Sequence, residues 1–152
     1  MTEKDKISLT LLNEELVYLD KSLYSLKLSL EKSQGIGTKK EYSFEEMETF
    51  DSFTSKFGRT SDLYTQKVLR TIWMLLHEAF LPFIDMLNKA EKLSIIHSAD
   101  SLLEIRDLRN QITHEYIPEA ITDLIPEVME KCQDLFKNIE TTKNFIQQRN
   151  WN

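Results

Sequence analysis

The residues whose types and spacing could carry chemistry lie in one short stretch, Arg109 to Tyr116, which reads Arg-Asn-Gln-Ile-Thr-His-Glu-Tyr. The imidazole of His114 can take and give a proton near neutral pH. The guanidinium of Arg109 stays charged and can bind phosphate oxygens through two N–H groups at once. An imidazole and a guanidinium this close together suit the cleavage of a phosphodiester bond without a metal ion.

A helix through this stretch would place Arg106, Asn110 and His114 on one face, because residues four apart lie one above the other. Arg109 would lie one step around the helix. The remaining positions are largely apolar and include Leu102, Leu103, Ile105, Leu108 and Ile112. We therefore expect an amphipathic helix with a polar ridge, capped by Ser98 and ending near His114 to Tyr116, before Pro118.

The pattern Arg109-x4-His114-x-Tyr116, with Asn110 directly after the arginine, resembles a known family motif. It is similar to the R-x4-6-H motif of the HEPN superfamily, in the R-x4-H-x-Y form. That form is typical of HepT-type toxins, which are encoded beside a minimal nucleotidyltransferase (MNT) antitoxin. The residues that lead up to the motif resemble the family as well, and the resemblance covers residues 44 to 146.

The resemblance implies a metal-independent endoribonuclease toxin that uses no cofactor and cuts RNA, with transfer RNA as one candidate substrate. The ribose 2′-hydroxyl would attack the adjacent phosphate, with His114 as general base or acid and Arg109 stabilising the charge on phosphorus. Asn110 and Arg106 would support them. A homodimer would pair two motifs across a cleft, and the cognate nucleotidyltransferase would neutralise the toxin by attaching AMP to Tyr116.

The net charge of −6 argues against a nuclease, because proteins that hold nucleic acid usually present a basic surface. A second hypothesis is therefore a non-catalytic partner of a nucleotidyltransferase, which binds nucleotide or substrate in a groove lined by Arg109 and His114. A third hypothesis is a helical bundle whose polar ridge only satisfies the ends of its helices. The sequence alone leaves all three open.

Length and composition predict one helical domain over residues 1–152. The chain has 3 Gly, 3 Pro and 41% hydrophobic residues, enough to bury a core without disulfides. The sequence shows neither an apolar run of 18 residues nor a secretory leader, so we expect a cytoplasmic protein that does not cross a membrane. It also has no zinc-ligand spacing, and Cys132 falls in an apolar stripe that predicts burial.

The first forty residues predict a bundle helix followed by a loop. Leucines recur in alternating steps of three and four, which favours a narrow seam against a neighbouring helix; they are Leu9, Leu12, Leu16, Leu19, Leu23, Leu26 and Leu30. Residues 33–40 contain two glycines in a polar cluster and are expected to break this helix.

A second helix should begin at Ser43, since Ser43 and Glu46 match a capping box, and Gly58 is expected to end it. Thr60, Ser61 or Asp62 would then cap a third helix. That helix would contain His77 as a packed residue and would be interrupted near Pro82.

The final helix should run from about Pro118 or Asp123 to about Gln147, with Pro126 either in its first turn or at a kink. No strand pattern occurs. The fold class is therefore all-α, a HEPN-like up-and-down bundle of four to five helices.

Overall fold

The computed structural model describes residues 1–151, and these residues form five continuous helices and no strand. Helix α1 spans Glu3–Ile36. The second helix is assembled from α2 (Phe44–Asp62), a π-helical turn η1 (Leu63–Val68) and α3 (Leu69–Leu75). Helices α4 (Phe83–Lys92), α5 (Ala99–Thr113) and α6 (Pro118–Arg149) complete the chain. The expected all-α helical bundle is confirmed.

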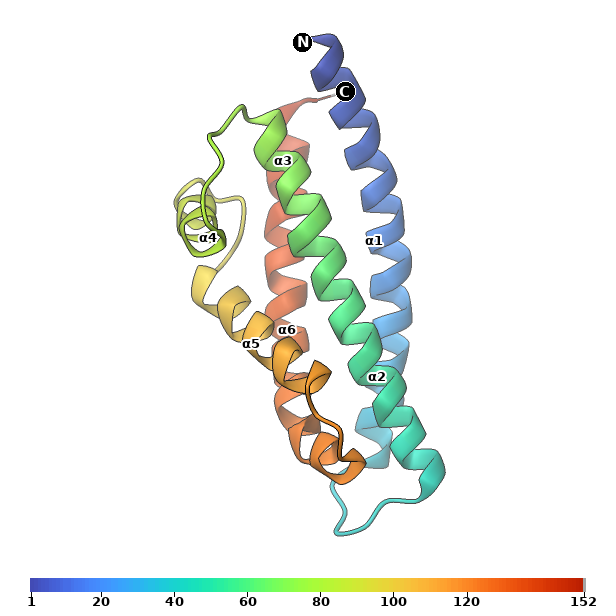
Figure 1. Cartoon of the computed structure of the whole chain (residues 1–152). Helices are drawn as coiled ribbons and strands as arrows, with labels where there is room; N and C mark the ends of the chain where they lie inside the picture. The colour runs from blue at the N-terminus through green and yellow to red at the C-terminus, as the bar shows by residue number, and fades with distance from the viewer. Residues whose placement is uncertain (152) are drawn as a thin grey trace.

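The long helices alternate in direction. Helix α1 runs down one side, α2 to α3 returns upward beside it, α5 descends and α6 returns behind them, while α4 is seen nearly end-on (Figure 1). Close contacts join α1 to α2 and α3, and α6 to α2 and α5. Helix α5, which carries the first part of the Arg109–Tyr116 motif, is therefore fixed against both α6 and α2.

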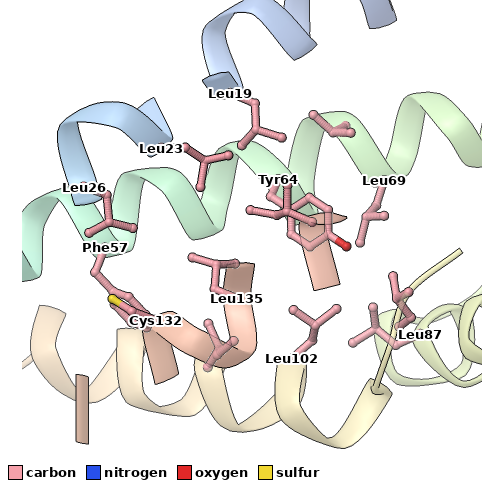
Figure 2. Close-up of a cluster of buried hydrophobic side chains, with 14 of the residues drawn as sticks. Leu19, Leu23, Leu26, Phe57, Tyr64, Leu69, Leu87, Leu102, Cys132 and Leu135 are labelled. Carbon is pink, nitrogen blue, oxygen red and sulfur yellow. The ribbon is translucent and has the colours of Figure 1, made fainter. Parts of the chain in front are cut away.

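One cluster of buried hydrophobic side chains connects the helices (Figure 2). Leu19, Leu23 and Leu26 of α1 lie in this cluster together with Phe57 of α2 and Leu135 of α6. The leucine seam of α1 is therefore its buried stripe. Cys132 is fully buried in the same cluster, as its spacing predicts.

Two buried polar networks join the helices within this apolar core. The Tyr64 hydroxyl lies 2.6 Å from Thr142 Oγ1, and Thr142 Oγ1 donates a 2.7 Å hydrogen bond to the Ile95 carbonyl. Burial raises the pKa of Tyr64 well above its ordinary value. Between α1 and α3, Thr71 Oγ1 donates to the buried Glu15 carboxylate at 2.6 Å. The hydrophobic periodicity of the sequence does not predict these polar contacts.

The predicted start of the second helix is confirmed, but its predicted end is wrong. Ser43 Oγ accepts from the Glu46 amide, and Glu46 Oε1 accepts from the Ser43 amide, which completes the capping box. Gly58 lies inside α2 and does not end it, because the buried stripe continues through Thr60 and Ser61 into η1. Tertiary packing outweighs the weak helix propensity of one glycine.

The expected break at residues 33–40 begins later than predicted. Helix α1 continues through Gly35 to Ile36, and the chain leaves it at Gly37, where φ is +74°. Ser33 is fully buried, so packing extends the helix into the polar cluster. Gly37 supplies the backbone conformation that ends it.

The expectation of a packed His77 inside a helix is also wrong. Helix α3 ends at Leu75, and His77 follows with a φ of +56°, the left-handed conformation that often terminates a helix. The His77 side chain is exposed, and its Nε2 lies 3.0 Å from Asp5 Oδ1. Pro82 therefore lies just before α4 and interrupts nothing.

The last two helices begin and end close to their predicted positions. Ser98 caps α5 by accepting from the Ser101 amide, and His114 is the C-terminal cap residue. Helix α6 begins at Pro118 and continues past Pro126 to Arg149, so the later start near Asp123 is wrong.

Candidate functional site

The start of the motif helix is held by one buried side chain. Asn138 of α6 is fully buried, and its Oδ1 accepts from the His97 and Ser98 amides, both at 2.9 Å. Its Nδ2 donates to Ser101 Oγ and to the Asp134 carbonyl. Every hydrogen-bonding group of this amide is therefore used, which fixes where α5 begins relative to α6. Its position in a largely apolar series, between Leu135 and Ile139, is the only sequence signal for this role.

An ion pair supports the same arrangement from outside. Lys131 Nζ of α6 lies 2.5 Å from Glu104 Oε2 of α5. The Glu104 carboxylate, through its hydrogen bond, raises the pKa of the Lys131 ammonium. Helix α5 is thus connected to α6 both at its first turn and near its middle.

Arg109 is bound along one edge by Asp62 of α2. Its Nε lies 3.1 Å from both Asp62 carboxylate oxygens, and its Nη2 lies 2.7 Å from Asp62 Oδ2. Its Nη1 contacts Thr113 Oγ1, one turn later on α5. A guanidinium has five N–H groups, so one on each terminal nitrogen has no partner within residues 1–151. Asp62 is one of the three residues that the sequence offers as a helix cap, but it makes no capping hydrogen bond and is instead the partner of the motif arginine.

The position of Gly58 explains how the Arg109 side chain reaches Asp62. A Cβ atom at Gly58 would lie 3.6 Å from Arg109 Cγ and 3.9 Å from Arg109 Nε. The arginine therefore passes directly over the glycine backbone on its way to the carboxylate. Helix α2 supplies both the surface that the arginine crosses and the anion that it binds.

None of the other predicted residues of α5 takes part in this ion pair. Asn110 and His114 are exposed, and no side-chain hydrogen bond or ion pair of His114 occurs in the described part of the chain. Arg106 is half-buried, with its guanidinium carbon 5.2 Å from the ring centre of Phe83 at the start of α4. The predicted ridge of Arg106, Asn110 and His114 is present on α5, with the imidazole at its end.

Tyr116 lies in the short link between α5 and α6 and is 87% exposed. Its hydroxyl has no hydrogen-bond partner among residues 1–151. Tyr116 is therefore not a core residue, in contrast to the buried Tyr64, whose hydroxyl is bonded to Thr142 Oγ1.

A groove of about 850 Å³ lies where α2, the end of α5 and the start of α6 meet. Arg109 and Tyr116 line it, whereas His114 and Asn110 do not. Four carboxylates border the groove, from Glu48, Asp51, Glu115 and Glu119, against the guanidiniums of Arg59 and Arg109. Within one chain, the motif is thus divided between an acidic groove and an outward-facing ridge.

The described residues contain no group of three or more His, Cys, Asp or Glu side chains arranged to hold a metal ion. In residues 1–151 no helix is both long enough and apolar enough to span a membrane. Comparisons with protein-family models, with curated proteins and with solved structures returned no match. The protein is an all-helical bundle in which Arg109, His114 and Tyr116 lie at and just beyond the end of α5.

Proposed function

We propose that this chain is a metal-independent endoribonuclease of the toxin type, with His114 and Arg109 as its catalytic residues. The observation that carries the proposal is the exposure of the Asn110–His114 edge of α5 beside an arginine held in a fixed orientation. An imidazole without a protein partner is available to exchange protons with a substrate. The terminal nitrogens of Arg109 are available to a phosphate oxygen.

The proposed reaction uses the substrate's own ribose as the nucleophile. The 2′-oxygen bonds to the adjacent phosphorus while an imidazole removes its proton. The bond from phosphorus to the 5′-oxygen then breaks, and that oxygen takes up a proton. The products are a 2′,3′-cyclic phosphate and a 5′-hydroxyl. Substrates would be single-stranded or looped RNA, because a regular helix rarely aligns the 2′-oxygen with the scissile bond; transfer RNA is one such candidate.

The proposal includes a homodimer that brings two ridges together. One histidine cannot easily serve both the entering and the leaving oxygen, and a second copy of His114 would supply the other proton transfer. The separation of His114 from the acidic groove supports this arrangement, because the ridge faces outward, where a second chain can approach. Positive charge from two copies each of Arg106 and Arg109 would then gather at one cleft.

Regulation by a nucleotidyltransferase antitoxin completes the proposal. The antitoxin would transfer AMP from ATP to the Tyr116 hydroxyl, with release of pyrophosphate and the phenol proton; this hydroxyl belongs to an exposed side chain and has no hydrogen-bond partner in the described chain. The added phosphate would place negative charge beside Arg109 and repel RNA. Such a pair would act in the cytoplasm. Incubation with the antitoxin and ATP should add the mass of one AMP at Tyr116, and none to a Tyr116→Phe variant.

One observation favours the second candidate, a non-catalytic partner of a nucleotidyltransferase. Asp62 already neutralises Arg109, and the groove beside it is bordered by more carboxylates than guanidiniums. Such a groove disfavours a polyanion such as RNA, so it would hold a substrate of the partner enzyme without cleaving RNA.

A cleavage assay separates the two candidates. Purified wild type, His114→Ala and Arg109→Lys should be incubated with total small RNA in the presence of a chelator. His97→Ala is the matched control, since His97 is also exposed and only its backbone amide is hydrogen-bonded. We expect wild type and His97→Ala to cleave RNA and His114→Ala to lose at least a hundredfold in rate.

The chemistry is tested with a synthetic copy of the cleaved RNA that carries one 2′-deoxy nucleotide at the scissile position. Cleavage should stop at that position only. A wild-type protein that leaves all RNA intact, and whose induction leaves growth unchanged, would refute the nuclease proposal in favour of the partner candidate.

A further inference from the structure

The outer face of α1 exposes large apolar side chains that no other helix covers. Six of the fourteen exposed large hydrophobic residues of the described chain lie on this helix. Their exposed fractions run from 43% to 69%, and they are Ile7, Leu11, Val17, Tyr18, Tyr24 and Leu28. Single exposed apolar residues are ordinary, but a row of them on one helix indicates a contact surface.

These residues form one strip along the helix. At about 100° per residue, the column Ile7, Glu14, Lys21 and Leu28 runs along the middle of the strip. Leu11, Tyr18 and Ser25 flank the column on one side, and Thr10, Val17 and Tyr24 flank it on the other. The strip lies on roughly the opposite side of α1 from the buried leucines, so it faces away from the bundle.

The strip is self-complementary when it is read in the opposite direction. Each exposed apolar residue has an exposed apolar counterpart at the position that makes the two numbers add to 35. The three pairs are Ile7 with Leu28, Leu11 with Tyr24, and Val17 with Tyr18. Two antiparallel copies of α1 centred between residues 17 and 18 would therefore bring Ile7 and Leu28 together near the centre line and place the flanking apolar residues at matching heights on the two helices.

The charges on the strip follow the same rule. Glu14 and Lys21 in the central column add to 35, and so do the exposed Glu3 and Lys32, which lie near the same centre line. Antiparallel packing in this register would bring each of these charges next to an opposite one. A parallel arrangement would instead place Glu14 against Glu14 and Lys21 against Lys21, which is unfavourable.

We propose that the outer α1 face, defined as the strip from Glu3 to Lys32, binds a second copy of this chain in an antiparallel arrangement. The two-fold axis passes between residues 17 and 18. A lipid surface fits this face poorly, because Glu14 and Lys21 occupy the middle of the strip. In a second copy of α1, residues whose numbers add to 35 match apolar with apolar and acidic with basic side chains. An unrelated helix would not be expected to match both kinds of position.

The size of the face predicts a reversible contact. The helix extends about 45 Å between Glu3 and Lys32 at 1.5 Å per residue. Two helices that meet over such a length and a width of about 10 Å bury roughly 1,000 Å², at the low end for specific interfaces. We therefore expect a dimer whose population depends on protein concentration and falls as salt screens the charged pairs.

This contact is separate from the motif. Helix α1 lies along one long edge of the bundle, whereas α5 lies on the side of α6 and α4 (Figure 1). The inference therefore does not depend on the proposed ribonuclease activity or on a dimer through the motif ridge. If both contacts form, assemblies larger than a dimer result, and loss of the outer α1 contact leaves dimers.

Charge reversal at the centre of the face tests the register. In Glu14→Lys, both central pairs become lysine against lysine, and in Lys21→Glu both become glutamate against glutamate. Each variant alone should weaken the assembly by about tenfold or more. A mixture of the two variants restores opposite charges at both positions and should restore the assembly as a heterodimer. Sedimentation velocity at several concentrations measures each outcome.

The matched control is Glu140→Lys, which reverses an exposed charge on α6 outside the face. It should sediment as wild type. A wild-type chain that is monomeric at 100 µM would overturn the proposal, and so would an assembly that neither single reversal weakens or that mixing does not restore. Circular dichroism confirms that each variant keeps its helix content, which is expected because both positions are exposed.

Disulfide cross-linking gives a second, independent measurement. Chains with Ile7→Cys and chains with Leu28→Cys should cross-link when they are mixed and oxidised, because these positions face each other. Ile7→Cys alone should not cross-link, since its two copies would lie about 31 Å apart, at 21 residues of helix rise. The buried Cys132 does not compete. Cross-linking of Ile7→Cys alone, with none in the mixture, would refute the antiparallel register.

Discussion

Asp62 binds Arg109 edge-on, with Nε 3.1 Å from both carboxylate oxygens and Nη2 2.7 Å from one of them. Both side chains are only about 30% exposed, at 29% and 31%. The carboxylate of α2 therefore sets the orientation of the one cation that the proposed reaction requires on phosphorus. The ion pair also joins α2 to α5 at the mouth of the groove.

Replacing Asp62 should therefore disturb the orientation of Arg109 more than it weakens the binding of RNA. We expect Asp62→Ala to lower kcat for RNA cleavage by about tenfold to a hundredfold and to leave KM within about threefold. It should also lower the free energy of unfolding by about 1 kcal/mol, since the pair is partly exposed. Asp51→Ala removes a groove carboxylate of α2 that does not bind Arg109, and serves as the control. An unchanged kcat in an active enzyme would contradict the positioning role.

Replacing Gly58 with alanine should stabilise the protein. The glycine lies inside α2, and an added Cβ would meet Arg109 at an ordinary contact distance of 3.6 Å. Alanine has the higher helix propensity, so we expect a gain of about 0.5–1 kcal/mol in urea denaturation. Gly37→Ala is the contrasting variant, because its φ of +74° and ψ of −170° favour glycine, and it should destabilise the chain. A loss of stability in Gly58→Ala would show that Arg109 has no room to adjust.

Removing the Asn138 side chain should release the start of the motif helix. Asn138→Ala leaves the His97 and Ser98 amides without their acceptor in a buried setting, at a cost of about 2–3 kcal/mol. Hydrogen exchange should accelerate most at the first turn of α5. Asn13→Ala, at an exposed position of α1, is the control and should change stability by less than about 0.5 kcal/mol. Uniform exchange along α5 would argue against a local role.

The Cys132 thiol should make stability depend on alkaline pH. Burial raises its pKa to about 12, above the ordinary value, so between these values the folded state binds the proton that the unfolded state loses. Stability should therefore fall as pH rises above about 8.5, by at most about 1.4 kcal/mol per pH unit. The difference in the free energy of unfolding between wild type and Cys132→Val, measured at each pH, separates the contribution of this thiol from that of other titrating groups. Iodoacetamide at pH 8 should label Cys132 only after denaturation.

The sequence predicts the ends of helices correctly where a local signal, such as a capping residue, is not opposed by tertiary contacts. The Ser43–Glu46 capping box and the Ser98 cap both mark true helix starts, because hydrogen bonds within one turn satisfy them. The helix end predicted at Gly58 failed because the residues that keep α2 helical are bonded to distant parts of the chain. Thr60 Oγ1 lies 2.6 Å from Ser22 Oγ of α1, for example, and is fully buried.

The sequence could predict only those features of the candidate site that depend on residue spacing within one helix. Residues on α5 were placed on a ridge by their spacing alone, and that ridge is present. The pairing of Arg109 with Asp62 joins residues 47 positions apart, which no periodic pattern encodes. The same limit applies to Asn138, whose partners lie about forty positions earlier in the chain.

The π-helical turn at Leu63–Val68 has a consequence for insertions and deletions. Each bond in such a turn spans one residue more than an α-helical bond, so the turn holds extra chain within a continuous helix. Deleting one residue inside it can convert the turn to α-helix while α2 and α3 keep their faces toward the core. The same deletion in the middle of α2 would rotate every following side chain by about 100°. Homologues of different lengths should therefore place their gaps at this turn.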